Sequence, residues 1–394
     1  MRVLHVTPYF APAFCYGGPP RSIFGLSRSL QRVGVDVQVF TTTANGNTDL
    51  PASRPDGDRY EGIPVRYFLR TFPRRWFSAT GLASALATTI RDYDLVHLHG
   101  LWNFPVWYAA TYARWCGIPY VISPRGMLER AAVAHRQGRK HLAYWLIERR
   151  NLAGATFLHA TSDAEAQRLH SYGFRVPIMT VPNGVVVRAQ PIVPPSSFRH
   201  RLGLDENTQI VTFIGRLHAI KRLDLLIAAF RQVQRQIPNV HLVIAGPEES
   251  GAASSVWRRE QAANPAIHRL GELKEEEKWS LLSESAAFAL CSDSESFGMS
   301  VVEAMAAGVP VVVTHTCPWQ EVETVGCGLW VPQQHDAVAT ALHWLLTHPT
   351  EARQMGDRGR GYAHTRYAWE PIARTMATYY ANALAECSRV QLAS

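Results

Sequence analysis

Short apolar runs alternate with longer amphipathic stretches along this chain. Residues 3–6 form the first apolar run, and residues 35–42 form the second. Between them, the apolar positions from Ile23 to Val33 are spaced three or four residues apart, which places them on one face of a helix. A pair of prolines just before that stretch suits the first turn of a helix, where a missing N–H is tolerated. The opening of the chain therefore predicts a strand, a helix and a second strand.

The same alternation continues through most of the chain. Further strands are predicted at residues 63–68, 94–99, 119–122, 156–160, 178–181, 209–215, 241–246, 287–292 and 309–314. Helical patterns separate most of them, for example at 225–233, 279–284 and 298–307. Strands that alternate with helices form parallel sheets covered on both faces, so the fold class is α/β.

A stretch rich in proline and serine at residues 189–200 interrupts this alternation and is typical of a linker. The sequence therefore predicts two α/β domains, residues 1–190 and residues 200–369, followed by a last helix at 369–384. Two such domains predict a cleft between them. Ligands of open α/β sheets bind beyond the carboxyl ends of the strands, so we expect the chemistry in the loops that follow strands.

Composition narrows the class of protein. The 394 residues are 47% hydrophobic and 18% charged, which excludes low-complexity, collagenous and coiled-coil chains. The net charge is +8, and it is uneven: residues 1–195 hold 22 basic and 11 acidic side chains, whereas residues 196–394 hold 18 and 21. A basic half favours an anionic partner. The six cysteines are sparse and form no C-x-x-C pair, so we expect a reduced, cytoplasmic compartment. The first residues lack the layout of a signal peptide, and no apolar run approaches the ~20 residues of a membrane span.

Two segments have the chemistry of a diphosphate site. Gly17 and Gly18 follow the first strand, where residues without a Cβ let backbone N–H groups approach a phosphate; a plain turn is the alternative. No G-x-G-x-x-G is present, so the dinucleotide fingerprint is absent. Arg216 and Lys221 come just after a later strand, and two cations beside a helix N-terminus suit a diphosphate. A solvated loop is the alternative for them.

Carboxylates mark a second kind of candidate. Glu295 stands before a predicted helix, and Glu303 lies eight residues on, among apolar neighbours. A carboxylate at each position suits sugar hydroxyl groups; the alternatives are an ordinary N-cap for Glu295 and a surface side chain for Glu303. A buried acid needs a partner, which favours a function for Glu303.

Histidine and arginine mark the candidates of the first domain. His97 and His99 point to the same side of one strand, and no third metal ligand lies near them in the sequence, so hydrogen bonding is favoured over a metal site. Arg125 follows the next strand and suits an anionic substrate group, or else a structural bond to a carbonyl. Acidic pairs elsewhere fit loop positions better than a metal site, and no Walker loop, G-x-S-x-G or H-E-x-x-H occurs.

Seven segments together resemble one known family, the retaining, nucleotide-sugar-dependent glycosyltransferases of family 4, or glycosyl transferases group 1. They are YGGPPRSIFGLSRSL, DLVHLHG, SPRGML, HATSDAE, VPNGV, IGRLHAIKRLD and ESFGMSVVEAMAAGVPVV. They run in the family's order over nearly the whole chain, and the spacing from Glu295 to Glu303 is the most specific part. The resemblance implies the GT-B architecture, with two Rossmann-like domains that face a cleft and a C-terminal helix, 370–394, that crosses back to the N-terminal domain.

The resemblance also implies a role for individual residues. The catalytic group would be Arg216 and Lys221 on the diphosphate, Glu295 on the donor sugar, and His99 near the bond that breaks. Glu303 would bind the ribose hydroxyls. Further donor contacts are implied at Gly17, Gly18, Gly215, Gly246, Phe297, Gly298 and Met299, and acceptor or cleft contacts at Arg125 and Asn183. The segment 314–323, with Trp319 and Glu321, departs from the glycine-rich sequence that the family often has there.

The implied activity is transfer of a sugar from a nucleotide-diphosphate sugar to a hydroxyl of a glycan or lipid-linked acceptor, in the synthesis of cell-surface polysaccharide. It would need no metal or other cofactor. A GT-B epimerase or phosphorylase, and a non-catalytic sugar-binding subunit, are the alternatives. No nucleic-acid-binding module is recognisable. Arginines mixed with aromatic residues at 70–77 and 136–150 suit an anionic membrane surface, and solvated surface is the alternative.

Overall fold

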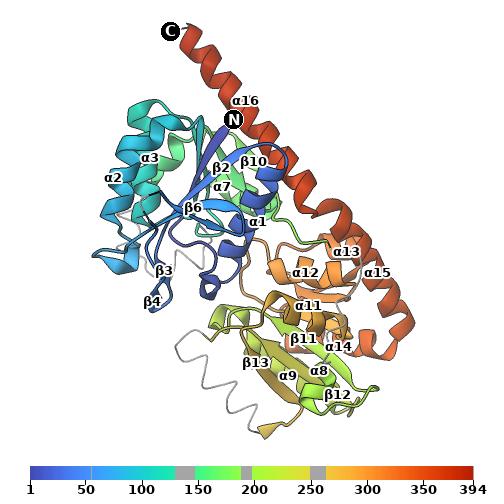
Figure 1. Cartoon of the computed structure of the whole chain (residues 1–394). Coiled ribbons are helices and arrows are strands. Elements are labelled where there is room, and N and C mark those ends of the chain that lie inside the picture. The colour runs from blue at the N-terminus through green and yellow to red at the C-terminus, as the bar shows by residue number, and fades with distance from the viewer. Residues whose placement is uncertain (55, 129–146, 188–197, 249–262, 394) are drawn as a thin grey trace. The chain divides into compact units, whose positions relative to one another are not determined.

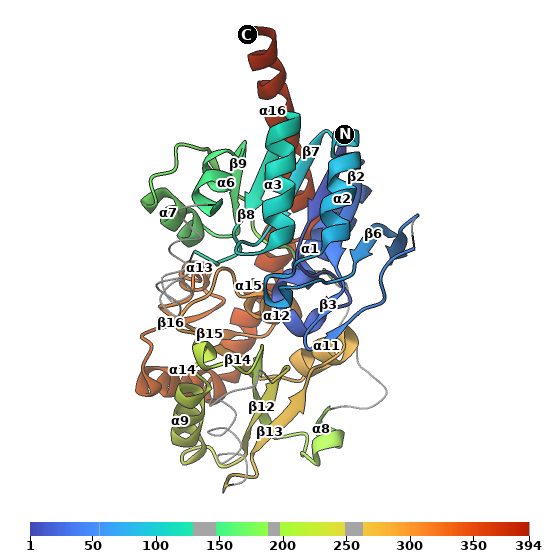
Figure 2. The same ribbon diagram turned by 90° about the vertical axis from the view of Figure 1, so that its left-hand side faces the viewer.

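The computed structural model describes residues 1–54, 56–128, 147–187, 198–248 and 263–393. The chain divides into two compact units: unit 1 comprises residues 1–184 with 369–394, and unit 2 comprises residues 185–368. Each unit contains one large sheet with helices packed against it (Figures 1 and 2). Most of the predicted linker, and residues 136–146 of the second arginine-rich stretch, lie outside the described residues.

The sheet of unit 1 has eight strands, and a two-stranded hairpin lies beside it. The strands are β1 (Arg2–Val6), β2 (Asp36–Thr42), β5 (Asp58–Tyr60), β6 (Ile63–Phe68), β7 (Leu95–His99), β8 (Tyr120–Ser123), β9 (Phe157–Ala160) and β10 (Ile178–Thr180), with the hairpin β3 (Ala44–Asn45) and β4 (Thr48–Asp49). Their order is β10-β9-β8-β7-β1-β2-β6-β5. The expected parallel pairing is confirmed except at β5, which pairs antiparallel with β6. Glu61 and Gly62, both with positive φ, make the tight turn between these two strands.

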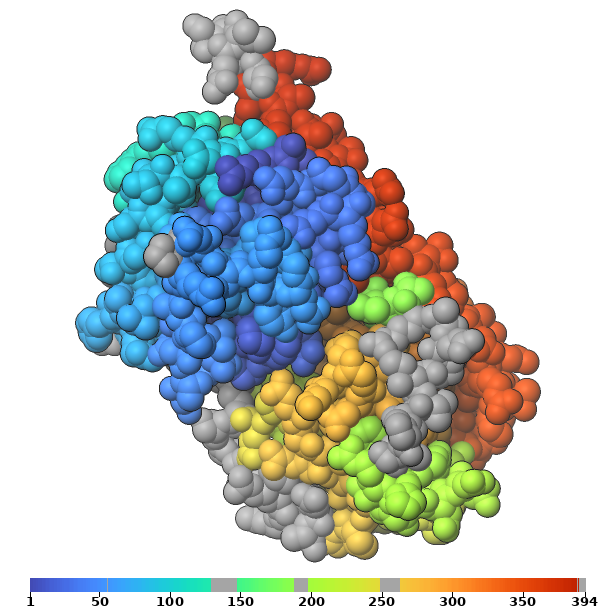
Figure 3. All heavy atoms as spheres, in the orientation of Figure 1, coloured from blue at the N-terminus to red at the C-terminus, as the bar shows by residue number. Residues whose placement is uncertain are grey.

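Helices cover both faces of this sheet, as the sequence predicts. α1 (Gly18–Arg32) and α16 (Trp369–Ala393) lie on one face, and α2 (Thr80–Thr89), α3 (Phe104–Cys116) and α7 (Asp163–Ser171) lie on the other. Neighbouring residues of β1 show the division, because Val3 packs in the first layer and Leu4 in the second. Figure 3 shows α16, in red, lying along the blue N-terminal residues of unit 1.

Trp369 anchors the start of α16. A Cβ added at Gly25 or at Gly184 would lie 2.3 Å from the Trp369 ring. The indole ring therefore contacts the backbone of α1 on one side and the segment after β10 on the other. Both positions require glycine, because any larger residue would displace the ring and the helix that carries it.

Unit 2 has a six-stranded parallel sheet. Its strands are β11 (Gln209–Ile214), β12 (Val240–Ala245), β13 (Ile267–Gly271), β14 (Ala287–Leu290), β15 (Val311–Thr314) and β16 (Gly328–Val331), in the order β13-β12-β11-β14-β15-β16. Its described helices are α8 (Phe198–Leu202), α9 (Leu223–Gln234), α11 (Glu275–Ser283), α12 (Met299–Ala307), α13 (Glu321–Val325), α14 (His335–Thr347) and α15 (Pro349–Arg366). The sequence predicts no strand at β13 or β16. Both are edge strands with few buried residues, so their apolar signal is weak.

Each sheet has one point where the direction of strand addition reverses. In unit 1 the chain adds β2, β6 and β5 on one side of β1 and then β7 on the other, so the reversal lies between β1 and β7. In unit 2 it lies between β11 and β14 for the same reason. Open α/β sheets bind ligands at the carboxyl ends of the two strands that flank such a point. Within the described part of the chain, no helix has both the length and the apolar composition needed to cross a bilayer.

Candidate functional site

Lys221 and Glu295 meet at the reversal point of unit 2. Lys221 ends a short 3-10 helix (Ala219–Lys221) after β11, and Glu295 lies in the loop after β14. The Lys221 ammonium donates to Glu295 Oε1, which also accepts from Ser292 Oγ at 3.0 Å. The two loops are joined by their backbones as well, because Asp293 N donates to the carbonyl of Ile220 at 2.8 Å. The structure therefore brings together a cation and a carboxylate that are 74 residues apart in the chain.

Glu295 does not cap the following helix. The N-cap of α12 is Gly298, at φ +86°, which has no side chain to cap the helix. The alternative interpretation of Glu295 as an ordinary N-cap is therefore wrong. Phe297 is buried, and Met299 is the first residue of α12. Residues Glu295 to Gly298, called the β14 loop below, therefore lead directly into the N-terminus of α12.

Arg216, Gly215 and Gly246 lie at the ends of β11 and β12. Arg216 is partly exposed, two residues past the end of β11. A Cβ at Gly246 would lie 1.9 Å from the carbonyl oxygen of Gly215, and Gly246 has φ +142°. This close approach of the two backbones is sufficient to require glycine at position 246. The sequence offers no sign of it, because the two residues belong to different strands.

Glu303 has a partner that sequence reasoning missed. It is buried on α12, and its Oε1 accepts from the Lys278 ammonium of α11 at 2.5 Å. Lys278 also pairs with Glu275 at 3.0 Å. The expectation that this acid needs a partner is confirmed, but the partner is a side chain of the protein. Lys278 orients one oxygen of the carboxylate that the resemblance assigns to the ribose. Lysine is rare in this chain, and that rarity is the sequence feature that could have marked Lys278 as a candidate partner.

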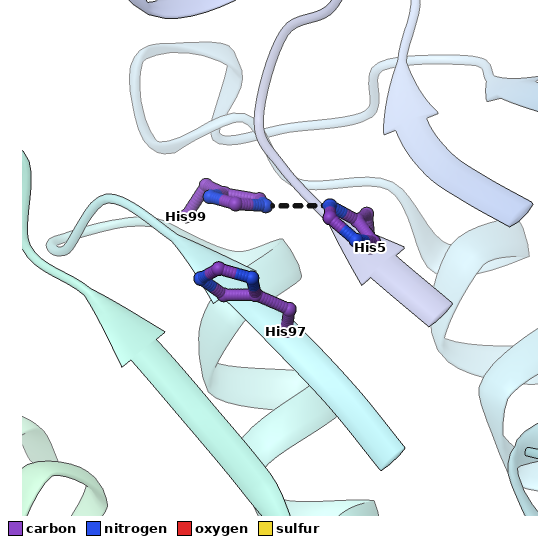
Figure 4. Close-up of side chains that lie close together, drawn as sticks. All are labelled: His5, His97 and His99. Carbon is purple, nitrogen blue, oxygen red and sulfur yellow. Dashed lines mark hydrogen bonds between the residues drawn. The ribbon is translucent and has the colours of Figure 1, made fainter. Parts of the chain in front are cut away.

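Three histidines gather at the reversal point of unit 1. His97 and His99 of β7 share one side of their strand, as predicted, and His5 of β1 pairs with His97 in register. Figure 4 shows the three rings close together, and a hydrogen bond of 2.9 Å joins His5 Nδ1 and His99 Nε2. The sequence does not reveal His5 as a neighbour of the other two, because it lies on a different strand.

The hydrogen bonds of a fourth buried histidine, His159 of β9, fix the tautomers of its own ring and of His97. The carbonyl of Val181 only accepts, so His159 Nε2 carries the hydrogen, and His159 Nδ1 accepts from the Ser123 hydroxyl at 2.5 Å. Ser123 Oγ then accepts from His97 Nε2 at 2.8 Å, and His97 Nδ1 accepts from the Tyr380 hydroxyl at 2.6 Å. Burial lowers the pKa of His159 to about 3 and that of His97 well below 6.5, in agreement with neutral rings.

Arg125 fixes the tautomer of His99 in the same way. Its Nε and Nη2 donate to His99 Nδ1 at 3.3 and 3.2 Å, so His99 Nε2 carries the hydrogen and donates to His5 Nδ1. Burial lowers the pKa of both His5 and His99, that of His5 to about 3. His99 is thus buried with both ring nitrogens bonded. His5 Nε2, a buried donor, has no hydrogen-bond partner among the described residues.

This bonding disfavours a metal ion at the three histidines. One nitrogen from each of His5, His97 and His99 lies within 4.8 Å of the others, which is close enough for a shared ion. However, both nitrogens of His97 are already bonded, and His99 Nδ1 faces the Arg125 guanidinium. A cation would have to displace these bonds and stand beside a positive charge. The arrangement therefore suits a network of neutral hydrogen bonds.

Arg125 is a partly buried cation held by uncharged hydrogen-bond partners. Its Nη1 donates to Ser22 Oγ of α1 at 2.9 Å and to Asn183 Oδ1 at 3.3 Å. Among the described residues, all its hydrogen-bond partners are neutral. Its backbone is left-handed, with φ +53°, and Glu165 supports the turn by accepting from Gly126 N at 2.6 Å. Burial lowers the pKa of Arg125 to about 10, so it stays charged at neutral pH.

Gly17 and Gly18 stand at the N-terminus of α1 on the same side of unit 1. Gly17 is the N-cap, with φ +86°, and Gly18 is the first helical residue. No acidic side chain occupies the first turn, and no side chain caps it. Hydrogen bonds thus join Arg125 to His99, Asn183 and Ser22, and Ser22 lies on α1, the helix that begins at Gly17 and Gly18. The remaining candidates, from Gly215 to Glu303, lie in unit 2.

Known proteins resemble this chain over nearly its full length. The sequence model of a family described as "Glycosyl transferase 4-like domain" matches residues 17–184, and that of "Glycosyl transferases group 1" matches residues 196–362. A D-inositol 3-phosphate glycosyltransferase of Segniliparus rotundus is 27% identical over 97% of this chain and 88% of its own length. One from Catenulispora acidiphila is 27% identical over 97% and 94%.

Solved structures share the fold. Sucrose-phosphate synthase from Thermosynechococcus elongatus superposes with a TM-score of 0.75 at 21% identity, over 98% of this chain and 99% of that one. HepE from Anabaena, crystallised with UDP and glucose, superposes with a TM-score of 0.76 at 19% identity, over 97% and 100%. The overall fold is thus common to these proteins.

Proposed function

Since the chain belongs to the GT4-type glycosyltransferases, enzymes of the GT-B fold that transfer hexosyl groups, we propose that it retains the configuration of the sugar it transfers. The donor is a nucleotide-diphosphate sugar, and the acceptor is a hydroxyl of a glycan or a lipid-linked glycan. The relatives in sequence are named D-inositol 3-phosphate glycosyltransferases, and one solved structure that shares the fold holds UDP and glucose. Those names support the class of donor and leave the sugar and the acceptor to experiment.

One observation carries this proposal: Lys221 stands at the reversal point of unit 2, held by Glu295 from the neighbouring loop. Glycosyl transfer breaks the bond between the anomeric carbon and the diphosphate, so negative charge grows on the leaving phosphate. A fixed cation there stabilises the transition state more than the ground state. Arg216, past the end of the same strand, supplies a second cation for the same group.

The reaction balances without a nucleophile from the protein. The anomeric C–O bond to the diphosphate breaks, and a C–O bond to the acceptor oxygen forms on the same face of the sugar. The acceptor proton passes to the departing phosphate oxygen, so no separate base is required. We therefore place Glu295 beside the donor sugar as a hydrogen-bonding group. With the leaving charge met by Arg216 and Lys221, we propose that activity needs neither a metal nor another cofactor.

The setting of Arg125 favours an acceptor that carries an anionic group. It presents a charge whose hydrogen-bond partners are neutral, at the reversal point of unit 1, beside His99 and the N-terminus of α1. A phosphate or carboxylate of the acceptor suits that position. The alternative, a structural arginine, is weakened by the left-handed backbone that the residue adopts, since such strain collects at functional sites.

We also propose that the protein binds a membrane surface on the cytoplasmic side. Phe72 and Leu69 are 92% and 60% exposed in the loop after β6. However, Arg70 and Arg74 both bond the carboxylate of Asp49, so they contribute less free charge than the sequence suggests. The attraction then rests on the exposed apolar side chains with Arg75 beside them.

The test is turnover of a panel of nucleotide sugars by wild type and Lys221→Ala. Product analysis with and without an acceptor separates transfer from epimerisation and phosphorolysis. We expect Lys221→Ala to lower turnover by about 100-fold or more while the thermal midpoint is kept, because it removes a charge from the leaving group. Arg353→Ala on α15, which removes an exposed cation from the same unit, is the control. Near-wild-type turnover of Lys221→Ala would contradict the assignment.

A further inference from the structure

The segment 314–323 departs from the sequence that the resemblance implies, and the structure shows what it contacts. It follows β15, the neighbour of β14 in the sheet. Thr316 Oγ1 donates to the carbonyl of Ser292 at 2.5 Å, and Cys317 Sγ lies 3.7 Å from the same oxygen. The segment therefore lies against the loop that follows β14. On the other side, that loop bonds the residues after β11 through Asp293 and Ile220.

Trp319 of this segment contacts the β14 loop directly. Its indole Nε1 donates to the carbonyl of Phe297 at 2.5 Å, and its side chain is fully buried. The rings of Trp319, Phe297 and Tyr367 pack together, with centroids 5.4 to 5.7 Å apart. Such tilted aromatic contacts hold each ring in one orientation. The carbonyl of Phe297 is thus satisfied by a rigid, buried donor.

Gly298 brings the same indole against the backbone. A Cβ at this position would lie 3.0 Å from Trp319 Nε1, and its φ of +86° is one that other residues rarely adopt. Gly298 is also the N-cap of α12, the helix that carries Glu303. Trp319 therefore contacts the β14 loop at the point where it becomes the helix, and it restrains the loop there.

A second layer holds the aromatic group in place. Glu321 accepts from the Tyr367 hydroxyl at one oxygen, and from the Tyr362 hydroxyl at the other, at 2.6 Å. Burial, with the charge of Glu321, raises the pKa of Tyr367, and burial with the bond to Glu321 raises that of Tyr362 to about 12. Both tyrosines therefore stay protonated and continue to donate.

We propose that Trp319 is a positioning residue for donor binding, supported by Glu321 through Tyr367. It holds the β14 loop in the shape that receives the diphosphate and sugar of the donor, so the loop does not have to be ordered when the donor binds. The inference rests on the proposed function for its ligand. Its structural half, the restraint of the loop, does not depend on that function. Trp319 acts through Phe297 and Gly298 and takes no part in bond breaking.

Amide hydrogen exchange of the protein without ligand tests the restraint. In Trp319→Phe the ring is kept and the N–H donor is lost, so we expect the amides of residues 297–301 to exchange at least tenfold faster. Tyr367→Phe keeps the ring and loses the bond to Glu321, so a smaller acceleration of the same amides is expected. Trp344→Phe on α14, where the indole stacks on His348 just after the helix, is the control. Unchanged exchange at 297–301, or equal acceleration throughout unit 2, would overturn the proposal. If Trp319→Phe fails to fold, Tyr367→Phe decides.

Calorimetric binding of UDP-glucose and of UMP tests the ligand half. We expect Trp319→Phe to bind UDP-glucose about tenfold more weakly and UMP unchanged, because the loop faces the sugar and its diphosphate rather than the nucleoside. Equal weakening of both ligands indicates a general structural defect and contradicts positioning. If wild type binds no nucleotide sugar of the panel, the proposed donor class is wrong, and hydrogen exchange still decides whether Trp319 restrains the loop.

Discussion

Glu148 is a buried carboxyl group whose ionisation should make the stability of unit 1 depend on pH. It is fully buried just before α6 (Arg149–Ala153). Its Oε1 accepts from Trp102 N at 2.5 Å and from Trp107 Nε1 at 2.6 Å, and its Oε2 has no hydrogen-bond partner among the described residues. Trp102 lies in the loop after β7, so Glu148 holds the segment that follows His99. Burial raises the pKa of Glu148 to about 7 from its ordinary 4.5.

The size and the sign of the effect follow from that pKa. Above pH 4.5 the unfolded chain has lost this proton while the folded protein keeps it, so folding takes up a proton. The free energy of unfolding should therefore fall as pH rises from 4.5, by about 1.4 kcal/mol per pH unit, until the folded group ionises near pH 7. The whole loss amounts to about 3 kcal/mol, and about 2 kcal/mol of it falls between pH 5 and 7.

Glu148→Gln isolates this contribution. The amide oxygen still accepts from both tryptophans, but the group no longer titrates, so the variant should lack the loss that wild type shows. Urea denaturation followed by tryptophan fluorescence at several pH values from 5 to 8 measures the difference between the two proteins. The buried histidines titrate in both and cancel. Glu370→Gln, an exposed change on α16, is the control. A wild-type-minus-variant difference that stays constant from pH 5 to 8 would refute the reasoning.

Two other changes probe unit 1. Tyr380→Phe removes the donor to His97 Nδ1 and leaves a buried acceptor unsatisfied, so urea denaturation should show a loss of about 1–3 kcal/mol. Tyr379→Phe, one position earlier on α16, should change stability little, and equal losses would contradict the assignment. Phe72→Ala should reduce flotation with vesicles that contain anionic lipid, whereas Trp115→Ala, an exposed site on α3, should not. Wild-type flotation that is absent, or that is independent of lipid charge, argues against the membrane surface.

The sequence alone determines most of the fold because its signals are local. Apolar runs and helical spacing identify the central strands and the helices between them, since a residue's burial follows from its own neighbours in an element. Weakly buried edge strands such as β13 and β16, and the antiparallel β5, escape this reasoning. Candidate loops were found because parallel strands place their carboxyl ends together, so any loop after a strand is a candidate.

Only the tertiary structure decides what each candidate side chain contacts. His5 bonds His99 across 94 residues, and Tyr380 bonds His97 across 283, so no local pattern predicts either contact. The same holds for Lys278 beside Glu303 and for Trp319 beside Phe297. A hydrogen bond depends on positions within a few tenths of an ångström, which packing of distant elements determines. The sequence therefore states which chemistry is present, and the fold determines which groups are held neutral, paired or restrained at each strand end.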